Sequence, residues 1–137
     1  MLVAMAVAAG LASAAQAEPF PPLKIDVEAM KSGQLPPAGT PEEADACAVH
    51  AQLVAMIVIN SPKFDTAPKD RVNEIVHLSI AWLDRAAGYR KTTWRSLQTD
   101  KASTEVVMAW GKAASPNLIV PLEDGCTRRI NALDNKS

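Results

Sequence analysis

The segment that most restricts the fold of this chain is the apolar run from Ala44 to Ile59, which follows a strong helix start signal. Thr40-Pro41-Glu42-Glu43 places a threonine at the N-cap, proline at the first helical position and glutamate three residues after the cap. Only Asp45, His50 and Gln52 interrupt the apolar residues that follow. Because a helix that is apolar on nearly every side must be covered by other elements, we predict a central, buried helix here that ends at Asn60-Ser61-Pro62.

Three later segments carry apolar residues at helical spacing of three and four. They cover about 66–88 with Pro68 in the first turn, about 103–114, and about 121–133. Residues 89–102 between them are polar and basic, with Trp94 and Leu97 as expected packing anchors. No turn signal joins alternating strands, so the sequence predicts an all-α fold. We expect a small four- or five-helix bundle, most simply an up-and-down one, over residues 41–134.

The two cysteines lie on the first and the last predicted helix of this bundle. Cys47 and Cys126 make an even count, and an exported chain with an even count normally pairs its thiols. A Cys47–Cys126 disulfide would close a loop of about 79 residues. Two free buried thiols and a reactive thiol beside His50 are the alternatives. We predict the structural disulfide.

Residues 1–17 have the character of a secretory signal peptide. They contain no charged side chain and end in the small-x-small site Ala15-Gln16-Ala17. The apolar run is shorter than the roughly 20 residues that a membrane-spanning helix needs. A signal peptide usually has a lysine or arginine before its apolar run, and none precedes the run here. We predict cleavage after Ala17, a periplasmic or secreted location, and no transmembrane segment in the mature chain.

Residues 18–40 form a proline-rich stretch before the bundle. Six of the ten prolines lie between positions 19 and 41, and prolines favour extended backbone because they remove amide donors and restrict the residues before them. We therefore expect an extended or loosely docked arm. Its central part, Leu23–Lys31, is compatible with either a short helix or a strand.

Charge is distributed unevenly along a chain whose net charge is −1. Such a balance argues against a general nucleic-acid binder, which carries a basic excess. A local basic cluster nevertheless stands out, and it consists of Arg85, Arg90, Lys91, Arg95 and Lys101. It is a candidate anion-binding surface for an envelope component or an acidic partner. The alternative is a solvated segment that pairs with the acidic residues before it.

Few residues are candidates for catalysis or metal binding. The only histidines, His50 and His77, are weak metal candidates because neither belongs to a metal-binding motif. His50 on an apolar helix is more simply a hydrogen-bonded core residue. No nucleophile elbow, phosphate-binding loop, dinucleotide fingerprint or haem-attachment motif occurs. We therefore expect no cofactor and assign no catalytic residue.

These observations favour an exported, non-enzymatic binding or interaction module of the bacterial cell envelope. Its partner would be a protein or an anionic envelope component, and the sequence does not identify which. A periplasmic stress chaperone that exposes apolar helices in acid is one alternative. A small enzyme or a metal carrier is another. The sequence leaves the oligomeric state open.

Overall fold

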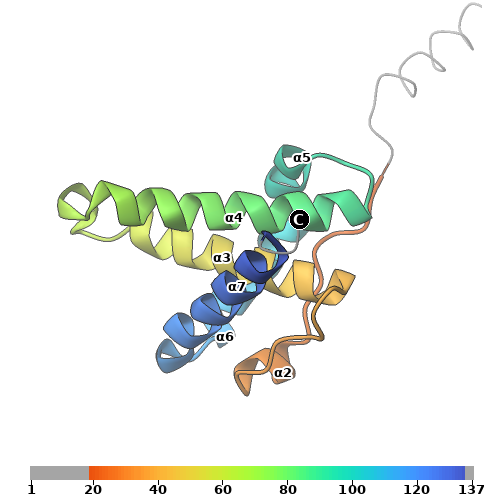
Figure 1. Ribbon diagram of the computed structural model, residues 1–137, viewed down its shortest axis with the longest axis horizontal. Coiled ribbons are helices and arrows are strands. Elements are labelled where there is room, and N and C mark those ends of the chain that lie inside the picture. Colours follow the sequence, from red (N-terminus) through yellow and green to blue (C-terminus); the bar gives the residue numbers. More distant parts are fainter. Residues whose placement is uncertain (1–18, 135–137) are drawn as a thin grey trace, which may run out of the picture.

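A computed structural model describes residues 19–134, and this part of the chain is helical without strands. Six α-helices lie within it, which corrects the expected four or five (Figure 1). They are α2 (Val27–Lys31), α3 (Pro41–Ile59), α4 (Lys69–Tyr89), α5 (Trp94–Thr99), α6 (Lys101–Ala113) and α7 (Ile119–Asp134), and two short 3-10 helices, η1 (Phe64–Thr66) and η2 (Pro116–Leu118), join them. The additional helices are α2 and α5, which are too short to show a clear apolar period.

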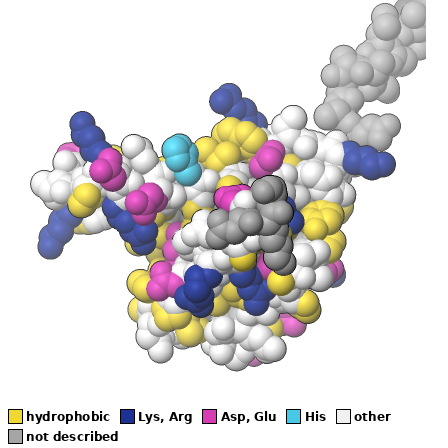
Figure 2. Space-filling view, viewed as in Figure 1, with side chains coloured by type: hydrophobic (Ala, Val, Ile, Leu, Met, Phe, Trp, Pro, Cys, Tyr) yellow, Lys and Arg dark blue, Asp and Glu magenta, His cyan; other side chains and the backbone are white. Residues whose placement is uncertain are grey.

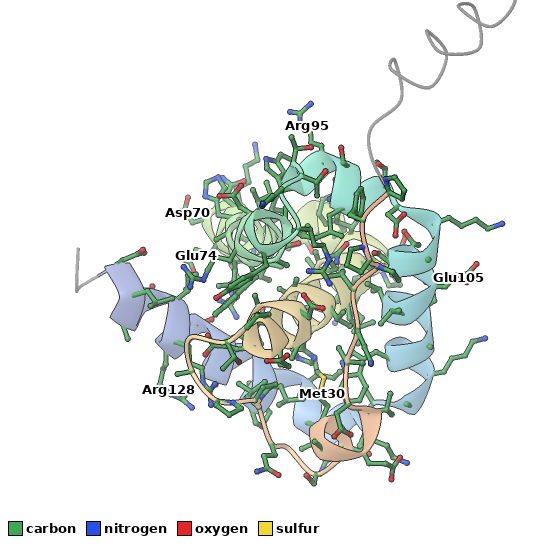
Figure 3. All side chains as sticks on the ribbon, turned by 90° about the vertical axis from the view of Figure 1, so that its right-hand side faces the viewer. Met30, Asp70, Glu74, Arg95, Glu105 and Arg128 are labelled. Carbon is green, nitrogen blue, oxygen red and sulfur yellow. A yellow bond between two sulfur atoms is a disulfide. The ribbon has the colours of Figure 1, made fainter. Side chains whose placement is uncertain are left out.

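Helix α3 is the centre of the fold, as its composition predicts. The Thr40 hydroxyl accepts a hydrogen bond from the Glu43 amide at 3.1 Å, so the predicted N-cap is confirmed. Glu43 reaches back to the amide of Gly39, one residue earlier than a standard capping box requires. From Glu43 to Ala51 every residue is buried. Seen nearly end-on in Figure 3, α3 is surrounded by α2, α4, α6 and α7.

Helices α3 and α4 form a long hairpin that α6 and α7 cross (Figure 1). The apolar spacing predicted for this helix is confirmed in its C-terminal half, where Trp82, Leu83 and Ala87 are fully buried, and Ala86 is buried with them. The indole N–H of Trp82 donates to the Cys126 carbonyl of α7 at 3.3 Å. The sequence expectation of a stop near Gly88 agrees with the end of α4 at Tyr89.

The region predicted as a polar linker, residues 89–102, contains the short helix α5. Thr93 caps this helix by accepting from the Ser96 amide, and Leu97 is its buried anchor. Asp100 then caps α6 by accepting from the Ser103 amide. Two caps seven residues apart therefore turn the chain twice, which carries it from the end of α4 onto the first turn of α6.

The N-terminal segment, residues 19–40, packs on the bundle. Residues 19–26 are extended, and α2 follows after Asp26, which caps it by accepting from the Ala29 amide. Leu23 and Met30 are almost fully buried in the core. The segment is therefore part of the hydrophobic core. The predicted signal peptide, residues 1–17, lies outside the described residues and stays a prediction.

The Cys47–Cys126 disulfide is present, as predicted. It joins α3 to α7, with the two Cα atoms 5.6 Å apart, and both cysteines are completely buried. Among the helices described here, none combines the length and the apolar character that a bilayer crossing requires. The space-filling view in Figure 2 shows basic, acidic and apolar side chains intermixed over this face of the molecule.

Replacing both cysteines (Cys47→Ser with Cys126→Ser) should lower the free energy of unfolding by about 4.5 kcal/mol, because the bond closes a 79-residue loop in the unfolded chain. Chemical denaturation followed by circular dichroism measures this difference. In the native protein the buried sulfurs should also resist a reductant that reduces the unfolded protein at once. A loss below about 1 kcal/mol would contradict the structural role of the bond.

Candidate functional site

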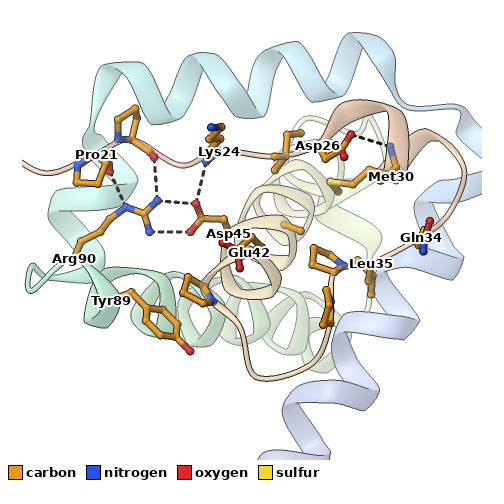
Figure 4. A pocket seen from close by; sticks show the side chains of 17 residues that line it. Pro21, Lys24, Asp26, Met30, Gln34, Leu35, Glu42, Asp45, Tyr89 and Arg90 are labelled. Atoms are coloured by element: carbon orange, nitrogen blue, oxygen red, sulfur yellow. Dashed lines mark hydrogen bonds and ion pairs between the residues drawn. The ribbon is translucent and has the colours of Figure 1, made fainter.

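The extended residues Pro21–Lys24 make no strand pairing, and side chains of three helices satisfy their backbone instead. Pro21 and Pro22 have no N–H groups, and their carbonyls accept from the Arg90 guanidinium at 2.6 and 2.9 Å. The Leu23 amide donates to Ser103 Oγ at 2.9 Å. The Lys24 amide donates to Asp45 Oδ2 at 3.0 Å. These four contacts fix the path of the segment across the bundle, and Figure 4 shows the three that Arg90 and Asp45 make.

Arg90 and Asp45 form the buried ion pair at the centre of these contacts. The two guanidinium nitrogens Nη1 and Nη2 donate to the two carboxylate oxygens at 2.8 and 2.6 Å. The side chains are only 8% and 9% exposed. Arg90 Nη1 also donates to the Ala86 carbonyl, so all five guanidinium N–H groups have acceptors. Removing one partner of such a pair strongly destabilises the folded protein, because a buried charge then remains uncompensated.

A second set of polar groups holds the same segment from α6. Ser103 is buried, and its hydroxyl donates to Asp100 Oδ2 at 2.7 Å while accepting from the Leu23 amide. Asp100 is thus both the cap of α6 and the acceptor that orients the Ser103 hydroxyl. The start of α6 and the N-terminal segment are therefore connected through one serine.

A second arginine–carboxylate bridge fixes the loop before α3. Arg129 of α7 pairs with Glu43 at 2.9 Å, and the same guanidinium nitrogen donates to the Pro36 carbonyl. Glu43 Oε1 accepts from the Gly39 amide. The arrangement repeats that of Arg90, since an arginine again joins an α3 carboxylate to a proline carbonyl. Both bridges place proline-bearing chain along the first turns of α3.

The stretches of chain that these two bridges hold border an open groove of about 990 Å³. We call it the proline groove, because five of its lining residues are prolines: Pro21, Pro22, Pro36, Pro37 and Pro41. Its apolar lining is completed by Ile25, Ala29, Met30, Leu35, Ala46 and Tyr89. Tyr89 is 46% exposed, so its ring is available to a ligand. Lys24, Asp26, Gln34 and Glu42 contribute polar groups, and the Asp45–Arg90 pair lies in the wall (Figure 4).

His50 is a hydrogen-bonded core histidine, as its apolar surroundings suggest. Its Nδ1 accepts from the Trp110 indole N–H at 2.9 Å, and its Nε2 lies 2.8 Å from the Ile119 carbonyl. An indole can only donate and a carbonyl can only accept, so the proton is on Nε2 and the ring is neutral. Burial lowers the pKa of His50 below 6.5, against the weaker effect of the Ile119 carbonyl. Its contribution to stability is therefore present above about pH 6.5 and is lost as the pH falls through the lowered pKa.

The two histidines lie in different surroundings. Both ring nitrogens of His50 are engaged, and His77 is exposed on α4. No group of three or more histidine, cysteine or carboxylate side chains within residues 19–134 has a geometry that could hold a metal ion.

The five residues of the predicted basic cluster occupy different environments. Arg90 is committed to Asp45 and the proline carbonyls, and it has no donor left for an external anion. Arg85 is half-buried. Lys91, Arg95 and Lys101 are exposed, and Arg95 stacks over the Trp94 ring at 5.1 Å. An anion-binding surface on these three exposed residues stays a prediction.

Two features of the candidate site were not predicted from the sequence. Asp45 was recognisable as a charge within an apolar helix, which demands a cationic partner, but its partner Arg90 lies 45 residues away, directly after the last residue of α4. The proline groove is formed by two proline-bearing stretches of chain that only tertiary contacts bring together.

Comparisons with protein-family models, with curated proteins and with solved structures found no match to this chain.

Glu123 of α7 is the one carboxylate in the described chain that is buried without a hydrogen-bond partner. It is 4% exposed, and neither of its side-chain oxygens is paired. Burial raises the pKa of Glu123 to about 7, the nearby Arg71 opposes the rise and Asp124 adds to it. The stability that this group contributes is present below its unfolded pKa of 4.5 and is lost as the pH rises through about 7.

Glu123→Gln should therefore gain stability relative to the wild type as the pH rises. Below about pH 4 the carboxyl is protonated in both the folded and the unfolded chain, whereas above about pH 8 only the wild type buries a charge. The gain between these limits should reach up to about 3 kcal/mol, since one pKa unit corresponds to about 1.4 kcal/mol. Urea denaturation at both pH values measures it. Glu105→Gln, at an exposed site on α6, is the matched control, and equal pH profiles of the two variants would refute the assignment.

Proposed function

We propose that this protein is an exported, non-enzymatic binding module of the bacterial cell envelope, and that the proline groove is its binding site. The observation that carries the proposal is the groove itself. It is open, largely apolar, and bordered by a few polar groups, which is the usual character of a ligand site.

The chemistry of the lining favours an aromatic group on the ligand. In several peptide-recognition domains proline-rich segments dock on aromatic side chains, and we infer the same contact here with the prolines on the side of the groove. Five proline rings and the exposed Tyr89 ring line this groove. The occupant would be an aromatic side chain of an envelope protein or an aromatic small molecule.

The groove is also built to be rigid. Proline fixes its own backbone φ angle, and the two arginine bridges hold the carbonyls of Pro21, Pro22 and Pro36. A site that is rigid before binding loses little conformational entropy when a ligand enters. The rigidity of the groove therefore supports a role in binding, because the site keeps its geometry when no ligand is present.

Export is the second part of the proposal. The predicted signal peptide supports it, and so does the buried disulfide, since such bonds form and persist in oxidising compartments. Periplasmic and secreted locations are both compatible with these two features.

Indole is a suitable probe for the groove, and amide resonances in nuclear magnetic resonance spectra are the readout. We expect titration with indole to shift the resonances of Lys24, Leu35, Glu42 and Tyr89, which line the groove. Ala29→Trp would place a ring in the groove and should weaken indole binding by about tenfold or more.

Glu28→Trp is the matched control, because Glu28 is the neighbouring residue of α2, is exposed, and is absent from the groove lining. It should bind indole like the wild type. Shifts confined to other surfaces, or equal binding by both variants, would overturn the proposed site.

A further inference from the structure

A second cavity, of about 320 Å³, lies where the loop between α2 and α3 meets α7. Leu35 lines both this cavity and the proline groove, so the two are neighbours. The loop contributes Gly33 and Leu35, and the other lining residues belong to α7. Two of them are arginines, Arg128 and Arg129, and none of the described residues that line the cavity is acidic. We call this cavity the arginine pocket.

The loop approaches α7 closely at Gly125. A Cβ atom at this position would lie 3.0 Å from Leu35 Cδ1, which is a closer contact than most Cβ atoms make. Glycine inside a helix costs up to about 1 kcal/mol relative to alanine, and the approach of Leu35 explains why it is present here. Arg128 Nη2 would be 3.9 Å from the same Cβ atom. The Arg128 side chain therefore folds back along α7 over Gly125, beside the loop that leads to α3 (Figure 3).

Arg128 has no polar partner in the part of the chain that the structure describes. Its guanidinium takes part in none of the ion pairs of residues 19–134 and makes no hydrogen bond there. Asp124 lies one turn earlier, at the spacing that favours an ion pair within a helix, yet the two form none. All five N–H groups of Arg128 are therefore available to a ligand.

Arg129 adds further donors to the pocket. Its Nη1 group donates to the Pro36 carbonyl and to Glu43. Its Nε and Nη2 groups, which carry three N–H bonds, donate to no acceptor within residues 19–134. The side chain is only 30% exposed. A partly desolvated guanidinium attracts an anion more strongly than a fully exposed one, because the local dielectric constant is lower.

Two arginines suit a tetrahedral oxyanion better than a carboxylate. One guanidinium is sufficient for a carboxylate, as the pair of Asp45 and Arg90 shows, in which two nitrogens bind the two oxygens. A phosphate group has three strong acceptor oxygens and can accept from two guanidinium groups at once. The local charge agrees with this, because Glu43 balances only one of the two arginines and leaves a positive charge uncompensated.

We propose that the arginine pocket is a phosphate-binding site, in which Arg128 and the unpaired side of Arg129 hold the oxygens of one phosphate group. Free phosphate and the phosphate of a lipid headgroup present the same oxygens to it. The site is separate from the proline groove, so it does not rest on the proposed function. It also differs from the basic cluster predicted from the sequence, to which neither arginine belongs.

Titration of the full chain with inorganic phosphate, followed by amide resonances in nuclear magnetic resonance spectra, tests this site. We expect the resonances of Gly33, Gly125 and Ala132 to shift, because these residues line the pocket. Arg128→Gln should weaken phosphate binding by about tenfold or more, since it removes one of the two charged donor groups. Circular dichroism should show unchanged helix content in this variant, because Arg128 is exposed.

Arg95→Gln is the matched control, because Arg95 is also an exposed arginine, belongs to the predicted basic cluster and lies outside the pocket. It should bind phosphate like the wild type. An absence of shifts at the pocket in millimolar phosphate would overturn the proposal. A loss of binding in Arg95→Gln that Arg128→Gln does not show would also overturn it and assign the anion to the basic cluster.

Vesicles distinguish the two sources of the phosphate group. Sedimentation with phosphatidylcholine vesicles that contain phosphatidic acid, lost in Arg128→Gln, would support the proposal and assign the pocket to a lipid headgroup. Arg128-dependent binding of inorganic phosphate without such sedimentation would support it and assign the pocket to a soluble phosphate. Sedimentation that requires Arg95 and not Arg128, without phosphate shifts at the pocket, would contradict it.

Discussion

The buried ion pair between Asp45 and Arg90 is the interaction on which the arrangement of this protein depends. A carboxylate on a helix covered from all sides is costly unless a cation reaches it. Arg90 reaches it from the end of α4, and its remaining donors bind the carbonyls of Pro21 and Pro22. A single guanidinium thus connects the start of α3, the end of α4 and an extended segment that has no strand partner.

The same solution occurs a second time on α3. Glu43, two residues before Asp45, is paired with Arg129, which also holds the Pro36 carbonyl. The disulfide then joins Cys47 to α7 one turn later. Three alternate positions on one helix, 43, 45 and 47, therefore fix other parts of the chain. The proline groove follows from this arrangement, because both proline-bearing stretches are held along the first turns of α3 while the space between them stays open.

Short-range sequence patterns predicted the features of the fold that depend on residues close together in the chain. The Thr40 cap, the central position of α3, the approximate helix limits and the disulfide all agree with the structure. Helix α5 was missed because six residues cannot show a period. Arg90 was assigned to a surface cluster because neighbours in sequence, Lys91 and Arg95, are exposed cations, and no local feature distinguishes the one arginine that turns inward. The polar interruptions Asp45 and His50 were visible, but their partners Arg90 and Trp110 are 45 and 60 residues away.

Hydrogen exchange at the amides of Leu23 and Lys24 tests whether the Asp45–Arg90 pair fixes the N-terminal segment on the bundle. In an extended segment without strand pairing these two N–H groups would normally exchange fast, but here they donate to Ser103 and Asp45. Both amides should exchange slowly, with protection comparable to that of the α3 amides, and Arg90→Ala should remove this protection while α3 stays protected. Rapid exchange at Leu23 and Lys24 in the wild type, beside a protected α3, would contradict this role of the ion pair.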